Sequence, residues 1–473
     1  MVKDMRTWID QLQQLGELVC INDEVQIGDI GAFCYHSRER ALLFENIKGY
    51  GRWKALAQAP ASMRHMALAL GVSGDQLIQH VASCVGKPLL GLKEVYDAPC
   101  KERVFKGNSI NLTSMPVHKH NEQDGGLYIG AGLGIVKDPE TGIQNLAFHR
   151  MMLKGEGKTG FRMAPRHTWR VYKKYAEQGM PMPTAVVIGH HPALYLAAAI
   201  TGSPDMCELE LAGSLMGRPL EVVKAETTDL MVPAYSEMVI EGRVMPGITE
   251  EEGPFGEYTG CYSAGKSQSQ VFEVDVITMR NDAIYKICQS GTCSEAAIYH
   301  WLPISVVLYN RMIGVGGGIQ VHNIRALPGS MCYVTQVTPS YEGHAKTALL
   351  AALSSENDMP KFIIAVDKDI DIYDLEDVSW ALSTRVDPSK DIIVLPNVRI
   401  HHYDPMLIKY SKDYQEVKWP LMSVGCKMAI DATLPVVDTS KRKRFEKALP
   451  ESLEDEFVTR LLKKFLLKGN PNE

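Results

Sequence analysis

At residues 251–260 the chain reads Glu251-Glu252-Gly253-Pro254-Phe255-Gly256-Glu257-Tyr258-Thr259-Gly260, a turn rich in glycine and proline with a carboxylate on each side. Glycine and proline at these spacings disfavour a regular helix or a central strand, so we expect a tight connector that directs Glu252 and Glu257 into shared space. Two carboxylates held close together cannot both ionise freely, and the pKa of one should rise toward that of a proton donor. An acidic surface turn is the alternative that this segment leaves open.

Composition restricts the class of protein. A chain of 473 residues exceeds one typical core, so we expect two or three domains. Hydrophobic residues at 45%, charged residues at 22% and a net charge of -6 are ordinary for a globular protein and do not favour a nucleic-acid partner. The cysteines form no C-x-x-C pair, and no apolar stretch approaches a membrane span. We therefore expect a soluble, cytoplasmic protein with free thiols and no membrane span.

The periodicity of apolar residues predicts a multidomain protein of mixed α+β and α/β type. Helical and strand-like segments alternate in residues 1–107, which predicts an N-terminal α/β domain that begins with a helix over 5–15. Short strands separated by glycine and proline predict a central, partly open β-barrel over 108–300, with a hairpin turn at 137–142. Buried-type strands at 332–337, 362–366 and 391–395 alternate with helices in residues 301–473 and predict a parallel sheet. A terminal helix over 453–466 would pack on this domain or on a partner subunit.

Three residues of the central segment are candidate ligands for a hard divalent cation. Asn145 is expected on a strand, His167 at a helix start and Glu208 before the next helix. An amide oxygen, an imidazole and a carboxylate suit manganese or magnesium better than zinc. As isolated residues, these three types are more often structural or exposed than metal-binding, and sequence spacing alone does not bring them together. Arg150 lies five positions after Asn145, so in an unbroken strand the two would face opposite sides, and a bulge would be needed for both to serve one ligand.

Four segments in order and at matching spacing carry a resemblance to UbiD-type decarboxylases. They are Asn145-Leu146-Ala147-Phe148-His149-Arg150, Glu208-Leu209-Glu210-Leu211-Ala212-Gly213-Ser214-Leu215-Met216-Gly217-Arg218-Pro219, the turn Glu252-Gly253-Pro254-Phe255-Gly256-Glu257-Tyr258-Thr259-Gly260, and Lys427-Met428-Ala429-Ile430-Asp431-Ala432-Thr433. The similarity covers nearly the whole chain. The length of the chain and its overall sequence pattern also resemble those of the large catalytic subunit of hydroxyarylic acid decarboxylases.

The resemblance implies a cofactor, metals and a reaction. It implies prenylated FMN, which a flavin prenyltransferase supplies, and a split barrel of the flavin-reductase type to bind it. It implies that Asn145, His167 and Glu208 hold Mn²⁺ beside the cofactor phosphate, with K⁺ nearby, where residues 195–200 could offer carbonyl groups. Glu210 competes with Glu208, which keeps the better distance to Ala212-Gly213. The implied reaction is reversible, non-oxidative decarboxylation of an aromatic, heteroaromatic or α,β-unsaturated acid through a covalent adduct with the cofactor, by a homodimer or homohexamer.

In the same family pattern, Arg150, Glu252 and Glu257 form a Glu-Arg-Glu network. Loss of CO₂ from an sp² carbon would leave an anion that no side chain can stabilise, so an electron sink is needed and a proton must follow. We expect Glu252 to be ionised beside Arg150 and Glu257 to be the neutral proton donor.

Other features remain open to more than one interpretation. The role of His149 is open, and residues 289–295 are either a wall of the substrate pocket or a structural loop. Two other functions are alternatives: a manganese-dependent hydrolase that uses the same ligands, and a flavin-binding module without turnover.

Overall fold

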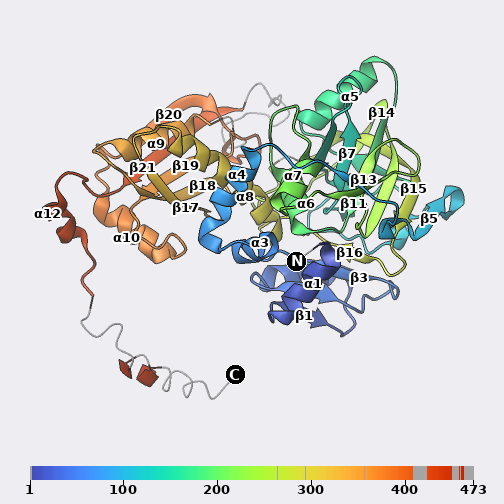
Figure 1. The fold of residues 1–473 in the computed structure, drawn as a ribbon, viewed down its shortest axis with the longest axis horizontal. Coiled ribbons are helices and arrows are strands. Elements are labelled where there is room, and N and C mark those ends of the chain that lie inside the picture. The colour runs from blue at the N-terminus through green and yellow to red at the C-terminus, as the bar shows by residue number, and fades with distance from the viewer. Residues whose placement is uncertain are drawn as a thin grey trace.

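The computed structural model describes residues 3–263, 265–292, 294–355, 357–407, 423–449, 457–458 and 460–462. Within these ranges the chain forms a multidomain α+β fold, in which the sheet of residues 320–432 lies apart from the sheets that precede it (Figure 1). The predicted fold class is therefore confirmed at the level of a multidomain α+β protein. The division at residues 107 and 300 stays a prediction.

The N-terminal residues build a four-stranded sheet against a short helical layer. The sheet has the order β1-β2-β3-β16. Its strands are β1 (Leu18–Ile21), β2 (Ala41–Phe44), β3 (Lys54–Ala57) and β16 (Ile284–Lys286), and the helices are α1 (Met5–Gln14), α2 (Ile30–His36), α3 (Met63–Leu70) and α4 (Leu77–Val85). Helix α1 matches the helix predicted over 5–15. It begins at Asp4, whose carboxylate accepts a hydrogen bond from the Thr7 amide and so satisfies a free N–H of the first turn.

A seven-stranded antiparallel sheet forms the centre of the molecule. Its order is β10-β15-β14-β11-β7-β8, and β5 pairs with β15. The strands are β5 (Arg103–Lys106), β7 (Leu133–Lys137), β8 (Gln144–Phe148), β10 (Lys158–Phe161), β11 (Met182–Ile188), β14 (Met238–Glu252) and β15 (Ser267–Met279). The predicted hairpin joins β7 to β8, with Val136 opposite Asn145. The strand order runs from β10 to β8 with no pairing between those two in the described part of the chain, so a closed barrel is not formed there.

Three helices and two small sheets complete the central region. The helices are α5 (His167–Glu177), α6 (Pro192–Ala199) and α7 (Glu208–Leu215). One small sheet has the order β13-β12-β4, from Met231–Pro233, Glu221–Lys224 and Lys93–Glu94, and the other pairs β6 (Tyr128–Ile129) with β9 (Met151–Met152). Helices α6 and α7 contact each other, and both contact β8. Strand β8 thus packs against both helices, and α7 begins at the candidate ligand Glu208.

The C-terminal sheet is mixed, with the order β17-β18-β19-β21-β20. Its strands are β17 (Gln320–Ala326), β18 (Cys332–Thr338), β19 (Phe362–Val366), β20 (Ile392–Arg399) and β21 (Val424–Ala432). The helices are α8 (Ser294–Ile313), α9 (His344–Leu353), α10 (Leu375–Arg385) and α12 (Thr439–Arg442). Strands β18, β19 and β21 run parallel; β18 and β19 are two of the predicted parallel strands, whereas β21 was not predicted.

The strand at residue 392 differs from the prediction. We predicted a buried parallel strand over 391–395, but β20 runs antiparallel to β21 at the edge of the sheet. Val394, for example, is 54% exposed. An antiparallel edge strand tolerates water on one face, whereas a parallel strand between helices would be covered on both. The predicted terminal helix over 453–466 lies largely outside the described residues.

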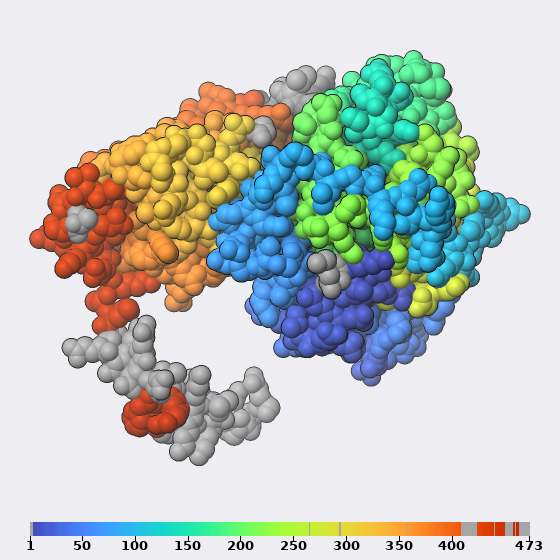
Figure 2. Space-filling view, viewed as in Figure 1, coloured from blue at the N-terminus to red at the C-terminus, as the bar shows by residue number. Residues whose placement is uncertain are grey.

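Helix α8 connects the central and C-terminal regions. It contacts α4 and α6 on one side and α9 and β17 on the other. In the space-filling view the C-terminal residues, in yellow and orange, meet the N-terminal and central residues along a continuous seam (Figure 2). The Gln79 side chain crosses this seam and donates a hydrogen bond of 3.2 Å to the His322 carbonyl. The candidate site described below also lies where segments from both sides meet.

Candidate active site

The glycine- and proline-rich turn is buried. Glu252 is the last residue of β14, and its exposed fraction is 1%, while that of Glu257 is 4%. The sharp exit from the strand needs Gly253, which has φ of 91° and whose Cβ would lie 2.5 Å from the Gly265 carbonyl oxygen. The Asp124 carboxylate fixes the middle of the turn by accepting a 2.8 Å hydrogen bond from the Gly256 amide. The alternative of an acidic surface turn is therefore excluded.

Arg150 joins the two carboxylates. Its Nε and Nη2 atoms donate to the two oxygens of Glu252, each at 2.9 Å, and its Nη1 donates to Glu257. The Arg150 side chain is 10% exposed. Strand β8 ends at Phe148 and β9 begins at Met151, so Arg150 lies in a break between two strands. The rule of alternating faces thus does not apply between Asn145 and Arg150, and the guanidinium is free to turn toward Glu252.

Aromatic side chains support this network from one side. The Arg150 guanidinium lies 4.7 Å from the centroid of the Phe255 ring, a cation–π contact that also packs the turn. The Tyr128 hydroxyl donates to Glu252 Oε1 at 3.0 Å and accepts from the Gly253 amide at 3.1 Å. Glu252 therefore receives three hydrogen bonds from Arg150 and Tyr128, whereas Glu257 receives one from Arg150.

The electrostatics distinguish the two ends of the network. Burial raises the pKa of the Glu257 carboxyl above its ordinary value; Arg150 opposes this shift and the charge of Glu252 adds to it. Burial disfavours the charge of the Arg150 guanidinium, but Glu257, Tyr403 and Glu252 outweigh this cost, so the pKa of Arg150 is raised well above its ordinary value. The arrangement is a permanent cation between a strongly hydrogen-bonded carboxylate and a carboxyl group that gains a proton readily.

The predicted metal ligands lie around β8. The Asn145 amide donates to Thr168 Oγ1 at 3.1 Å, and Thr168 is the neighbour of His167 at the start of α5. Glu208, at the start of α7, accepts a 2.9 Å hydrogen bond from the backbone amide of Leu146, the neighbour of Asn145. The three segments are thereby brought to one place. Among the described residues, no three His, Cys, Asp or Glu side chains are grouped so that they could hold a metal. The predicted set would not form such a group, because it combines one His and one Glu with Asn145.

The chemistry of these donors fits a divalent cation. Asn145 uses its NH₂ group on Thr168, which leaves its carbonyl oxygen free to act as a ligand. Burial raises the pKa of Glu208 to about 7, the behaviour of a carboxylate without a nearby positive charge. Glu208 is 3% exposed and faces β8, whereas Glu210 is half-buried. The geometry favours Glu208 over Glu210 as the ligand.

Several residues that support the site belong to no recognisable sequence motif and were not predicted. Tyr128, Asp124 and Thr168 support the network through side-chain hydrogen bonds, and each precedes or follows its partner by many positions in the chain. His149 also has a structural environment: its Nε2 lies 3.3 Å from Thr168 Oγ1, and its ring stacks on Phe161 at 4.2 Å. His149 thus orients Thr168, which binds Asn145.

Gln289 and Glu295, at the two ends of the segment 289–295, are engaged in internal contacts. Gln289 binds the His118 ring and the His120 carbonyl, and Glu295 forms a buried ion pair of 2.5 Å with Lys286. The segment lies next to the turn, because a Cβ at Gly260 would lie 2.9 Å from the Thr292 methyl group. These contacts favour the structural role for Gln289 and Glu295.

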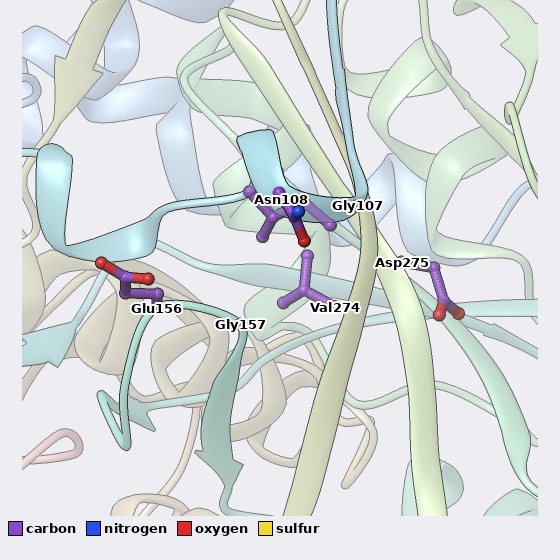
Figure 3. Close-up of a pocket in the computed structure, with 7 residues that line it drawn as sticks. Gly107, Asn108, Glu156, Gly157, Val274 and Asp275 are labelled. Atoms are coloured by element: carbon purple, nitrogen blue, oxygen red, sulfur yellow. The ribbon is translucent and has the colours of Figure 1, made fainter.

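A surface hollow of 520 Å³ lies away from these residues. It is lined by Gly107, Asn108, Ile110, Glu156, Gly157, Val274 and Asp275, with the two carboxylates at opposite ends (Figure 3). No residue of the Arg150 network or of the predicted metal site contributes to it. We assign the chemistry to the buried network and not to this hollow.

Buried histidines predict acid-sensitive stability. Burial lowers the pKa of His149 and His190 to about 4 and that of His191 to about 3, below the ordinary 6.5. The unfolded chain therefore binds more protons below about pH 6.5, and stability should fall as the pH drops from 6.5 to 4, by up to about 1.4 kcal/mol per histidine and pH unit. Urea unfolding at a series of pH values measures this slope. His190→Met should flatten it between pH 6.5 and 5, and an unchanged slope would contradict the assignment.

Comparison with known proteins assigns the family. Three family models match: the N-terminal domain of 3-octaprenyl-4-hydroxybenzoate carboxy-lyase at residues 9–85, its Rift-related domain at 93–293 and its C-terminal domain at 307–432. The chain belongs to the UbiD family. It is 31% identical over 459 residues to a phenolic acid decarboxylase of Sedimentibacter hydroxybenzoicus, with 92% of each chain covered. It is 29% identical to a phenolic acid decarboxylase of Bacillus subtilis, with 93% of this chain and 94% of the relative covered.

Solved structures of the same class share the fold. The UbiD-class enzyme HmfF from Pelotomaculum thermopropionicum, in complex with FMN, matches with a TM-score of 0.87 and 31% identity, covering 95% of this chain and 98% of the other. An evolved dimeric form of HmfF in complex with prenylated FMN matches with a TM-score of 0.84 and 30% identity, covering 96% and 98%. The resemblance predicted from the four sequence segments is confirmed.

Proposed function

We propose that the protein is a carboxy-lyase that decarboxylates an aromatic or heteroaromatic acid, reversibly and without oxidation, with prenylated FMN as cofactor. The observation that carries this proposal is the buried network in which Arg150 binds Glu252 and Glu257 together. The family and the relatives named as phenolic acid decarboxylases support the reaction class, and HmfF in complex with prenylated FMN supports the cofactor.

The residues of the network divide the work. When bound, prenylated FMN supplies the electron sink that accepts the charge left on the ring carbon as CO₂ departs. Arg150, anchored by two bonds to Glu252, binds and orients the substrate carboxylate or the flavin cofactor with a fixed guanidinium fork. Glu257, whose pKa is raised by burial, holds a proton and delivers it to the ring carbon after CO₂ leaves. In the reverse direction Glu257 accepts that proton as a base.

Asn145, His167 and Glu208 would hold Mn²⁺ and, through it, the phosphate of the cofactor. Replacing Glu208 by Gln keeps its size but removes the buried charge, so we expect the affinity for manganese to fall by at least ten- to a hundredfold. Metal analysis of the purified variant, with Mn²⁺ titration, measures this loss. The matched control is Glu210→Gln on the same helix, which should bind manganese as the parent does. Equal loss in both variants, or none in Glu208→Gln, would contradict the assignment.

Finer features follow from the family and remain part of the proposal. They are a split flavin-reductase-like barrel built from the central sheet, K⁺ bound near residues 195–200, a homodimer or homohexamer, and dependence on a flavin prenyltransferase in the cytoplasm. The dimeric form described for evolved HmfF supports the homo-oligomer. In the described residues no helix is long and apolar enough to cross a membrane.

The direct test of the cofactor is native mass spectrometry combined with an absorption spectrum. The protein is produced with and without a flavin prenyltransferase. We expect a bound mass that matches prenylated FMN only in the first preparation, together with release of CO₂ from an aromatic acid. A protein that carries no flavin in either preparation would overturn the proposed function.

A further inference from the structure

The C-terminal region contributes a tyrosine to the candidate active site. Tyr403 follows β20, and its carbonyl accepts a 2.9 Å hydrogen bond from Ser263 Oγ, which belongs to the segment after the Glu252–Glu257 turn. Its ring centroid lies 5.8 Å from that of Tyr258, the residue next to Glu257. Two contacts thus hold the loop around residue 403 against the turn from the other side of the seam.

The Tyr403 hydroxyl is available for a ligand. In the described part of the chain it makes no hydrogen bond, although the side chain is only half-buried and lies within electrostatic reach of Glu257 and Arg150. Burial, and next the charge of Glu257, raise the pKa of Tyr403 to about 12. The group is therefore a neutral phenol at any working pH and can both donate and accept a hydrogen bond.

Besides the charged groups of the Arg150 network, three histidine rings lie beside Tyr403 and its neighbour Tyr258. His401 and His402 have ring centroids 5.3 Å and 4.0 Å from that of Tyr403. His300, from α8, lies against Tyr258 with centroids 3.6 Å apart. Burial lowers the pKa of His300 and His401 to about 3 and that of His402 to about 2, so all three rings are neutral near pH 7. These neutral, polar rings suit a substrate whose aromatic ring carries a neutral polar group.

Two arginines offer a competing recognition mode. Arg166 binds Thr201 Oγ1 at 2.9 Å and Arg162 binds the Gln268 carbonyl at 3.4 Å, so neither is engaged with a carboxylate in the described residues. A second carboxylate on the substrate could bind them. Arg166 is exposed, however, and its Nη1 is already bound to Thr201.

We propose that Tyr403 is a specificity-determining residue whose hydroxyl binds a neutral polar group on the substrate ring, a phenolic hydroxyl or a ring N–H. This inference rests on the proposed function and goes further. Tyr403 would favour hydroxylated or heteroaromatic acids over unsubstituted aryl acids and over dicarboxylates. The C-terminal region then takes part in substrate choice as well as in packing.

Binding and turnover of matched acids test the inference. Calorimetry on protein loaded with FMN, which lacks the added ring, measures the dissociation constants of 4-hydroxybenzoate, pyrrole-2-carboxylate and benzoate without turnover. Tyr403→Phe removes only the hydroxyl. We expect at least one of the two polar acids to bind about five- to tenfold more weakly to the variant, and benzoate to bind as before. With the prenylated cofactor, KM for that acid should rise while kcat changes little. The control is Tyr373→Phe. The Tyr373 hydroxyl accepts a hydrogen bond from Asn323 on the same domain, and its removal should leave the three dissociation constants unchanged.

The outcomes separate the inference from the proposed function. Equal weakening for all three acids, or an equal loss of kcat, would mean that Tyr403 only positions Glu257 and would overturn the inference. Wild-type protein that binds benzoate as tightly as both polar acids would also overturn it, as would a preference for a dicarboxylate that Arg166→Gln abolishes. Protein that carries prenylated FMN and binds these acids selectively, yet releases no CO₂, would instead overturn the proposed function alone.

Discussion

Glu257→Gln should lower kcat for decarboxylation by about 10²-fold or more. Glutamine keeps the length of the side chain and its place beside Arg150, but its amide N–H is far too weakly acidic to protonate the ring carbon. The effect should lie in kcat and not in KM, because the cofactor and the carboxylate of the substrate are bound by other groups. Steady-state release of CO₂ from an accepted acid, with the cofactor content of each preparation matched, measures the change.

The matched control is Glu251→Gln, six positions earlier, near the end of β14. Glu251 is exposed and pairs with Lys266, so its replacement should leave kcat unchanged. The wild-type rate should also fall as the pH rises through the elevated pKa of Glu257, because the donor then loses its proton. A Glu257→Gln variant with the parental kcat would remove Glu257 from the proton-transfer step.

Arg150→Met should lower the free energy of unfolding by about 3–5 kcal/mol, in addition to abolishing turnover. The substitution leaves Glu252 and Glu257 buried, at 1% and 4% exposure, without their shared cation. A buried carboxylate that loses its cationic partner is left with a desolvation cost that no attraction offsets. This cost is larger than the net contribution of the ion pair to stability. Urea unfolding at neutral pH measures the loss.

Two further variants show where this loss originates. Adding Glu252→Gln to Arg150→Met removes the stranded carboxylate charge of Glu252 and should recover part of the stability. Arg243→Met, on the exposed side of β14, breaks half-exposed pairs with Glu273 and Asp275 and should cost no more than about 1 kcal/mol. Similar losses in Arg150→Met and Arg243→Met would contradict a buried, charge-balanced network.

The local chemistry of the turn could be predicted because glycine, proline and paired carboxylates restrict each other within ten residues. The hairpin at 137–142, the first helix and the parallel core of the C-terminal sheet followed from periodicity and turn residues for the same reason. What the residues alone could not supply was the pairing across the chain: Arg150 and Glu252 are 102 positions apart, and Leu146 and Glu208 are 62 apart. The resemblance to a family provided those pairings.

Other features depend on tertiary context that no local pattern encodes. The direction of β20 is decided by its position at a sheet edge, where an apolar run is half exposed. The break between β8 and β9, which releases Arg150 from the alternation of faces along β8, contains no glycine or proline that would have predicted it. Tyr403 lies in a segment with no glycine-rich turn, and only the packing of the C-terminal region on the Glu252–Glu257 turn brings it to the site.

Exchange of the ring proton tests the central claim most directly. Incubation in deuterated water with the decarboxylated product and prenylated FMN-loaded protein should place deuterium at the carbon that bears the carboxylate in the acid. The exchange should be lost in Glu257→Gln and retained in Glu251→Gln, as followed by NMR. Retained exchange in Glu257→Gln, or metal-dependent turnover of the acid by protein that contains no flavin, would contradict the account.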